Sequence, residues 1–371
     1  MSAPRVAVFA FDIAEASQIK TIRAIRAAGA GVESLSFRRD NMNAGFQPDW
    51  EDTPLGHAPN GVGPRRILAL LRGGMRVLLR RRALRRADVF LARNLDMALL
   101  ALLGRWASGN RAPLVYQCLD IHGLFARRGP LAALARRAEA MVLRRTHRLV
   151  LSSPRFLEAH FGPVHDWQGK TQVIENRIFW PGSPPPRPAA ALRNPGPLRV
   201  GWVGTLRCPR TLALLAETAD RMGPRVQIVL RGVVHGHQLP DFGKVISASP
   251  NMHYDGPYAY PEGLAQAYSG LDCVWAQDLW QRGGNSDWLL PNRLYEAGYF
   301  GCPSIAIAGT ETACVVRGRA LGLVIPEARA DILVPALEAS HTARGQLRRG
   351  LLARPDDAFC LTTDEIARML D

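Results

Sequence analysis

Glu296 lies in a segment whose pattern predicts a half-buried helix that can bind a ligand. Residues 285–306 read NSDWLLPNRLYEAGYFGCPSIA, and Pro291 suits the first turn of a helix. Gly301 then ends that helix, and Pro303 opens an apolar strand. Glu296 therefore lies between one and two turns into a half-buried helix, where its oxygens can accept both hydroxyls of a vicinal diol. A structural ion pair is the alternative role for this side chain.

Cationic side chains accompany a tight turn after another apolar run. The segment LRVGWVGTLRCPRTLALLAET passes from a strand through Gly204 and Thr205 to a helix, with Arg207 and Arg210 on either side of the turn. Backbone amides at a helix N-terminus and two guanidinium groups together suit a diphosphate. The alternative is that both arginines are solvated loop cations. Other strand and helix ends supply three further candidates for anion contacts: Arg231, Asn292 and Arg293.

Acidic and imidazole side chains follow two apolar runs in the first half of the chain. Asp12 and Glu15 stand in AFDIAEASQIKTIRAI, and Asp120 and His122 stand in CLDIHGLF. A transfer to a hydroxyl group needs a general base that takes up the hydroxyl proton. These four residues are the candidates for that base. A helix cap for Asp12 and a packed core position for His122 are the alternatives.

The elements that position these residues alternate between β-like and amphipathic helical runs, as in a parallel sheet wrapped by helices. Strands are predicted at residues 5–10, 32–37, 89–92, 114–117, 148–151, 172–175, 198–203, 226–230, 273–276, 304–308 and 322–325. Helices are predicted, among others, at residues 17–28, 131–145, 211–221 and 291–300. The pattern predicts an α/β protein with two Rossmann-like domains, whose ligands bind at the carboxyl ends of the strands.

A proline-rich stretch separates the two predicted domains. Residues 180–197, WPGSPPPRPAAALRNPGP, contain seven prolines, so neither a helix nor a central strand can run through them. We therefore expect a first domain at 1–180, a linker at 181–197 and a second domain at 198–371, whose last helix can pack back on the first domain. Two such sheets that face each other across a cleft can hold a donor on one wall and an acceptor on the other.

These motifs resemble the donor site of GT-B-fold glycosyltransferases of the large GT4-like group. PNRLYEAGYFGCPSI matches their pattern of Pro, four residues, Glu-Ala, three residues and Gly-x-Pro before an apolar strand. The resemblance implies that Glu296 binds the nucleotide ribose and that Arg207 and Arg210, in VGTLRCPR, grip the donor diphosphate. TQVIENRIFW resembles the segment before the interdomain linker, with Asn176 retained and Arg177 in place of the usual glycine. NSDWLLPNRLYE with GTLRC is similar to bacterial exopolysaccharide glycosyltransferases of the succinoglycan type.

The chain departs from this group at one position. Many members carry a second Glu eight positions before the first, beside the transferred sugar, and here that position is Trp288. The departure leaves open whether the sugar's anomeric configuration is retained or inverted. The candidates for contacts with the donor sugar are Asn285, Ser286, Asp287 and Leu290. In the first domain, His122 resembles the histidine that the group often places after the fourth strand.

The charge of the chain is concentrated in its first half. Residues 1–180 carry 28 Lys and Arg against 14 Asp and Glu, whereas residues 181–371 carry 19 against 18. Residues 65–86, RRILALLRGGMRVLLRRRALRR, hold nine arginines among apolar residues at helical spacing. Such a helix can lie on an anionic lipid surface, and its expected membrane contacts are Arg72, Arg76, Arg80 and Arg81. The alternative is a core helix with a solvated arginine face. Nucleic acid is not expected as a partner, because aromatic residues are not interleaved with these arginines.

Composition sets further limits. The six cysteines are scattered without a Cys-x-x-Cys pair, which favours buried free thiols in a reducing compartment. No Asp-x-Asp motif stands where the donor would need it, so neither a metal nor a cofactor is expected besides the nucleotide-sugar co-substrate. The N-terminus is predicted to be a first strand rather than a signal peptide, and no apolar run is long enough for a bilayer span. We therefore expect a cytoplasmic protein, peripheral on the inner face of the membrane.

The sequence thus predicts a GT-B glycosyltransferase that moves a sugar from a nucleotide donor, expected to be a UDP-sugar. The acceptor is expected to be a lipid-linked or polysaccharide intermediate in the biosynthesis of exopolysaccharide or other cell-surface glycans. Two alternatives remain: a nucleotide-sugar epimerase of the same fold, and a non-catalytic protein that binds membranes or nucleic acid.

Overall fold

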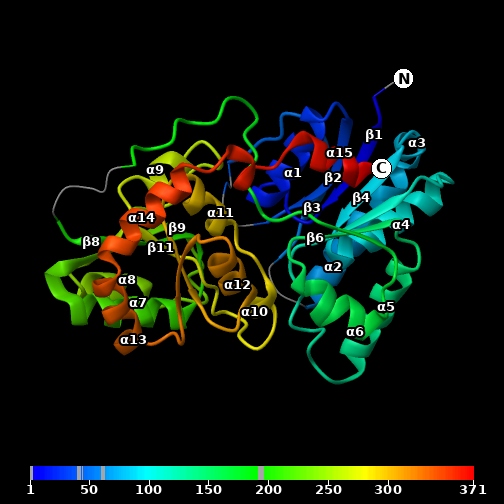
Figure 1. Cartoon of the computed structure of the whole chain (residues 1–371). Coiled ribbons are helices and arrows are strands. Elements are labelled where there is room, and N and C mark those ends of the chain that lie inside the picture. The colour runs from blue at the N-terminus through cyan, green and yellow to red at the C-terminus, as the bar shows by residue number, and fades with distance from the viewer. Residues whose placement is uncertain (1–2, 40–42, 44, 60–62, 191–195) are drawn as a thin grey trace. The chain divides into compact units, whose positions relative to one another are not determined.

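The computed structural model describes residues 3–39, 43, 45–59, 63–190 and 196–371 (Figure 1). Contacts divide the chain into two units: unit 1 comprises Met1–Glu175 and Leu361–Asp371, and unit 2 comprises Asn176–Cys360. The change of unit comes before the proline-rich stretch, so the described residues of that stretch belong to unit 2. Residues 191–195 of the expected linker lie outside the described residues.

Unit 1 is built on a seven-stranded parallel sheet in the order β3-β2-β1-β4-β5-β6-β7. Its strands are β1 (Arg5–Ala10), β2 (Gly31–Arg38), β3 (Glu51–His57), β4 (Val89–Arg93), β5 (Leu114–Cys118), β6 (Arg148–Leu151) and β7 (Lys170–Val173). Six of the seven were predicted, and the exception is β3. It reads EDTPLGH, and an edge strand tolerates such polar residues and a proline because it pairs on one side only.

Helices lie between most of these strands, because parallel pairing needs crossover connections, and one further helix comes from the C-terminal end of the chain. They are α1 (Ala16–Ala27), α2 (Pro64–Leu79), α3 (Arg81–Leu84), α4 (Asn94–Ser108), α5 (Pro130–Leu143), the π-helix η1 (Leu157–Phe161), α6 (Gly162–His165) and α15 (Thr363–Leu370). Helix α4 packs against α2 and α5, and α15, at the red end of the chain, packs beside the blue α1 (Figure 1). No helix among the described residues has both the length and the hydrophobicity needed to cross a bilayer.

Unit 2 contains a six-stranded parallel sheet in the order β10-β9-β8-β11-β12-β13. The strands are β8 (Leu198–Leu206), β9 (Val226–Val234), β10 (Met252–Tyr254), β11 (Cys273–Trp275), β12 (Ser304–Ile307) and β13 (Gly322–Ile325). The helices are α7 (Pro209–Met222), η2 (Gly223–Arg225), α8 (Phe242–Ala248), α9 (Leu264–Tyr268), α10 (Asn285–Trp288), α11 (Asn292–Tyr299), α12 (Glu311–Gly318), α13 (Ala330–Ala339), α14 (His341–Leu352) and η3 (Asp356–Ala358). The three-residue edge strand β10 was not predicted from the sequence.

Two glycines fix helix α11, which carries the predicted carboxylate. Gly301 has φ +69° beyond the last turn, a left-handed conformation that ends the helix as the sequence predicts. Gly298 lies against the ring of Phe359, and a Cβ at this position would come within 2.2 Å of that ring. The two α/β units with parallel sheets confirm the predicted fold class.

Candidate functional site

The order of strands in unit 2 reverses between β8 and β11, and such a switch point is where open α/β sheets bind ligands. Arg207 follows β8, and Asp278 follows β11. An Arg207 Nη2 lies 3.3 Å from Asp278 Oδ2, and 38% of the arginine side chain remains exposed. A guanidinium has five N–H donors, so this contact orients Arg207 and leaves donors for an anion. Arg210 is exposed in the first turn of α7.

Two glycines let the backbones of β8 and β9 approach closely at the same end of the sheet. Gly204 has φ +113° and Gly232 has φ +134°, and the two residues are register partners. A Cβ on Gly232 would lie 1.8 Å from the carbonyl oxygen of Gly204. The strand ends therefore present backbone without side chains, the surface that a ligand can approach most closely.

Glu296 is buried on α11, and only 4% of it is exposed. Its Oε2 accepts a hydrogen bond of 2.7 Å from the hydroxyl of Tyr268 at the end of α9. Burial, and next the charge of Glu296, raises the pKa of Tyr268 and that of Tyr258 well above the ordinary value, so both hydroxyls remain protonated donors. Tyr258 also lies in the field of two arginines, Arg293 and Arg231. The structure thus groups Glu296, Arg293 and Arg231 around one set of tyrosines.

Residues predicted to contact the donor sugar hold their own loop together. Ser286 Oγ accepts from the Gln281 N–H at 2.7 Å. Asp287 Oδ2 accepts from the Gly283 N–H at 2.8 Å, and its Oδ1 lies 2.5 Å from an Arg282 Nη1. Asn285 and Leu290 are buried, and the backbone carbonyl of Leu290 accepts from Asn176 Nδ2 at 2.9 Å. These contacts fix the backbone of the segment before α11.

Gln277 was not singled out from the sequence, yet it joins three elements at this end of the sheet. Its Nε2 donates to the carbonyl of Ser286 at 3.2 Å. Its Oε1 accepts from the Ile307 N–H at 3.2 Å and from the Thr310 hydroxyl at 3.0 Å. This buried amide therefore connects the ends of β11 and β12 with α10.

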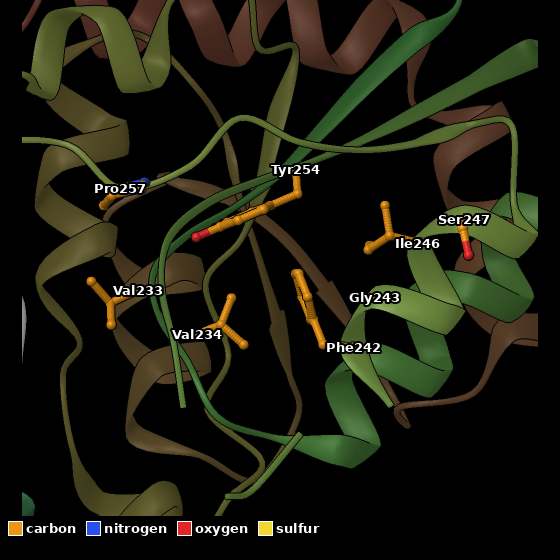
Figure 2. A pocket seen from close by; sticks show the side chains of 8 residues that line it. All are labelled: Val233, Val234, Phe242, Gly243, Ile246, Ser247, Tyr254 and Pro257. Carbon is orange, nitrogen blue, oxygen red and sulfur yellow. The ribbon is translucent and has the colours of Figure 1, made fainter. Parts of the chain in front are cut away.

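An open apolar pocket of about 580 Å³ lies near the ends of β9 and β10 (Figure 2). It is lined by Val233, Val234, Phe242, Gly243, Ile246, Ser247, Tyr254 and Pro257. The hydroxyl of Tyr254 donates to the carbonyl of Gly232 at 2.8 Å, which connects the pocket to the glycine pair. Such a lining suits a flat ring better than a charged group.

In unit 1, Asp12 and Glu15 follow β1 and take part in local contacts. Asp12 is buried, and its Oδ1 accepts from the Ala14 N–H at 3.1 Å. Glu15 Oε1 accepts from the Ser17 hydroxyl at 2.7 Å, and its Oε2 lies 3.4 Å from an Arg93 Nη1. Arg93 is buried and also donates to Gln117 Oε1 at 3.2 Å. Glu15 is thus held in place by a hydroxyl and a buried guanidinium.

Asp120 and His122 follow β5, and both are exposed. The Nδ1 of His122 accepts from the Leu124 N–H at 3.1 Å, so the neutral ring carries its proton on Nε2. Partial desolvation of the ring by its neighbours, and next the charge of Arg66, lowers the pKa of His122, although Asp96 opposes this shift. Arg66 pairs with Asp96, with Nε 2.9 Å from Oδ2, and lies over the ring of Phe11. The imidazole is therefore neutral at physiological pH.

A buried carboxylate on α5 binds two histidines and a tyrosine. Glu139 Oε2 lies 2.7 Å from His160 Nε2 and 2.8 Å from His165 Nε2, and its Oε1 accepts from the Tyr116 hydroxyl at 2.9 Å. The π-turn of η1, just before α6, separates the two histidines by five residues and places both on this carboxylate. The three residues are of types that bind metals. Two ligands of one zinc ion would lie roughly 3.3 Å apart, so the observed lengths are those of hydrogen bonds.

The predicted membrane-contact arginines on α2 and α3 have different surroundings. Arg80 Nη2 lies 2.5 Å from Glu33 and 3.0 Å from Glu51, and an Arg76 Nη1 donates to the Pro54 carbonyl at 3.0 Å. Arg72 and Arg81 are exposed. The buried face of α2 consists of Gly73, Gly74 and Val77. The apolar stripe points outward instead, through Ile67, Leu68, Leu71, Met75 and Leu79. Helices α4 and α5 also carry exposed apolar residues, Trp106, Leu131 and Leu134.

The sequence reasoning missed Tyr268, Gln277 and Asp278, each of which contacts a predicted site residue or fixes the loop that carries one. Asp278 could have been found, because it follows the strand adjacent to β8 and ligand-site polar residues follow strand ends. Tyr268 stands near the end of a short helix in an apolar context, and no local signal distinguishes it from a core tyrosine.

No protein-family model matches the chain. It is 35% identical over 337 residues to the succinoglycan biosynthesis protein ExoL of Rhizobium meliloti (strain 1021), which covers 90% of this chain and 84% of that protein. Among solved structures, it is similar to sucrose-phosphate synthase from Thermosynechococcus elongatus, with a TM-score of 0.69, 16% identity and coverage of 99% and 95%.

The chain is also similar to Anabaena Alr3699/HepE in complex with UDP and glucose, with a TM-score of 0.66, 14% identity and coverage of 98% of each chain. These structures show the fold, and the relationship to ExoL shows the family. Neither the epimerase nor the binding-protein alternative gains support. The chain therefore belongs to the family of the succinoglycan biosynthesis protein ExoL, and it has the fold of these solved structures.

Proposed function

We propose that the protein is a glycosyltransferase, which takes its sugar from a UDP-linked donor that unit 2 binds and transfers it to a lipid-linked glycan intermediate. The observation that carries the proposal is the buried carboxylate of Glu296, one to two turns into α11, which accepts a hydrogen bond from Tyr268. The similarity to a structure that contains UDP-glucose supports the choice of donor.

The donor would lie across the carboxyl ends of β8, β9 and β11. Glu296 would accept the ribose diol, and the oriented, half-exposed Arg207 would bind the diphosphate together with Arg210 and the first turn of α11, which carries Asn292 and Arg293. The bare backbone at Gly204 and Gly232 supports a close approach of the phosphates. The apolar pocket beside Gly232 supports a place for the uracil ring. Positive charge at the diphosphate would then stabilise the leaving group.

Calorimetry with UDP tests the ribose assignment. A diol hydroxyl that donates to a carboxylate contributes about 1.5–3 kcal/mol, so Glu296→Ala should weaken UDP binding about 100-fold or more. The control is Glu217→Ala on α7, which removes an exposed carboxylate that pairs with Arg221. Equal UDP affinity of Glu296→Ala and the parent would show that the ribose is bound elsewhere.

On the acceptor side, we place the acceptor hydroxyl beside Asp120 and His122 in unit 1. Both side chains are exposed after β5, whereas Asp12 and Glu15 are engaged in local contacts. A neutral imidazole can bind a hydroxyl and exchange a proton with it. His122→Ala and Asp120→Asn should each lower kcat with the purified acceptor and leave UDP binding unchanged. Unaltered kcat in both variants would remove this loop from the acceptor site.

We further propose that the outward stripe of α2 rests on an anionic membrane surface, at the inner face of the cytoplasmic membrane. Leu71, Met75 and Leu79 are 62–80% exposed, and exposed arginines including Arg72 and Arg81 flank them. Apolar side chains rimmed by cations match the chemistry of such an interface. Leu71→Ser with Met75→Ser should reduce flotation with anionic liposomes, whereas Val164→Ser, an exposed apolar control on α6, should not. Equal recovery of the parent protein with anionic and neutral liposomes would show that the arginines do not contribute to membrane binding.

A further inference from the structure

Glu296 is held by a tyrosine from a different part of the chain. Tyr268 is the last residue of α9, and Glu296 lies 28 positions later on α11, beyond β11 and α10. The phenol oxygen stands 2.7 Å from Oε2, and both side chains are buried. The tyrosine ring stacks on the ring of Phe300, with centroids 5.7 Å apart and planes 12° apart. Packing thus fixes the ring that carries this hydroxyl.

A tyrosine hydroxyl suits the positioning of a ligand-binding carboxylate better than a cation would. A glutamate side chain has several rotatable bonds, and a ligand that binds it must otherwise select one arrangement from many. A hydrogen bond from a neutral hydroxyl to a carboxylate is charge-assisted, and it fixes the side chain without cancelling its charge. A carboxylate has about four acceptor positions, and a hydrogen bond from one hydroxyl uses one of them.

The surroundings keep this hydroxyl a donor. Burial, and next the negative charge of Glu296, raises the pKa of Tyr268, so the phenol does not ionise near neutral pH. Tyr260 is buried as well and lies in the field of the same carboxylate. The carboxylate is therefore set among protonated phenols.

We propose that Tyr268 is a positioning residue for the donor: it holds the carboxylate of Glu296 in the orientation that receives the ribose diol. This inference rests on the proposed donor site, because it assigns Tyr268 an effect that is transmitted only through Glu296. Its consequence is a defined dependence on the ligand: the tyrosine hydroxyl matters for nucleotides that carry the 2′ and 3′ hydroxyls and not for those that lack them.

The experiment measures the affinity of the full chain for UDP and for 2′,3′-dideoxy-UDP by calorimetry, in the parent and in three variants. Tyr268→Phe removes the hydroxyl and keeps the ring. Glu296→Gln tests the carboxylate itself. Tyr299→Phe is the matched control, because Tyr299 is also on α11 and its hydroxyl donates to the Pro185 carbonyl at 2.8 Å.

We expect Tyr268→Phe to weaken UDP binding about tenfold and to leave the affinity for the dideoxy nucleotide unchanged. The control should alter neither affinity. In turnover assays, the KM for the donor should rise in Tyr268→Phe while kcat is retained.

Failure of the inference and failure of the donor site give different results. If the parent binds both nucleotides equally, or Glu296→Gln discriminates as well as the parent, the ribose role of Glu296 is wrong. If Glu296→Gln loses discrimination and Tyr268→Phe keeps it, the donor site stands and the role of Tyr268 is refuted. A Tyr268→Phe variant that loses affinity equally for both nucleotides would reveal a packing role, which also refutes the inference.

Discussion

The buried carboxylate of Glu139 gives the sharpest test of what stabilises unit 1. Its two contacts with histidine and one with Tyr116 join α5, β5 and the segment of η1 and α6. Replacing Glu139 with Gln keeps the shape and removes the charge. We expect this substitution to destabilise the protein without changing its fold.

The expected magnitude follows from these contacts. A hydrogen bond to a charged group contributes about 1.5–3 kcal/mol, and one between neutral groups about 0.5–1.5 kcal/mol. With both histidine contacts converted to the neutral kind, the loss is about 2–3 kcal/mol. For a unit of this size, that free energy lowers Tm by about 5–10 °C.

Scanning calorimetry of the parent and Glu139→Gln checks this figure. Glu158→Gln is the control, because Glu158 lies on η1 and forms an exposed pair with Arg155, and such pairs contribute about 0–1 kcal/mol. A chelator should leave the Tm of the parent unchanged, since the lengths around Glu139 are those of hydrogen bonds. A Glu139→Gln variant as stable as the control, or a chelator-sensitive parent, would refute the reasoning.

The pH dependence of the same variant has a defined sign. Burial alone would raise the pKa of Glu139, but the hydrogen bonds from His160 and His165 outweigh burial, and the net pKa is lowered. A carboxylate with a depressed folded-state pKa contributes stability above its unfolded pKa and loses it as pH falls through the folded value. The difference in the free energy of unfolding between the parent and Glu139→Gln should therefore be largest at neutral pH and become smaller at acidic pH.

Three further predictions concern the candidate sites. Gly232→Ala should weaken UDP binding at least about tenfold in calorimetry, because the new Cβ would overlap the Gly204 carbonyl oxygen and the φ of +134° disfavours a side chain. Asp278→Asn should raise the KM for the donor about three- to tenfold in initial-rate assays, since it loosens the orientation of Arg207, whereas an unchanged KM would show that Arg207 does not need this partner. If the neutral form of His122 serves the acceptor, kcat should be constant near neutral pH and fall as pH drops below the ordinary histidine pKa, because the pKa of His122 is lowered; a His122→Ala variant with the same pH profile would contradict this.

The sequence was most informative where burial on both faces of the sheet imposes an apolar run. The central strands and the edge strands β7 and β13 were predicted, while the edge strands β3 and β10 were not, because β3 is polar and contains a proline and β10 has only three residues. In the candidate donor site, Glu296 and Arg207 were singled out from the sequence because each stands near a glycine or proline that marks a helix or strand end. Tyr268 was not, since its partner is far along the chain and only folding brings the two together.

Helix α2 shows a second reason for the limits of sequence patterns. Its periodicity reveals an apolar stripe but not which face packs inward. The inward face uses Gly73 and Gly74, and a Cβ on Gly73 would lie 2.5 Å from the ring of Phe37. Close packing through glycine leaves no hydrophobic signature, so the leucine stripe that would ordinarily predict the core is the surface instead.

The return of α15 to unit 1 governs the order in which the newly made chain can fold. Helix α15 begins with a capping box between Thr362 and Glu365, and the Glu365 carbonyl accepts from Gln172 Nε2 at 3.0 Å. Unit 1 therefore lacks one of its helices until the ribosome has synthesised all of unit 2. During translation, unit 2 can complete its own core first, while the surface of α1 that α15 covers stays exposed. A chaperone could bind that surface at this stage. A chain truncated by a premature stop codon would lack α15 permanently.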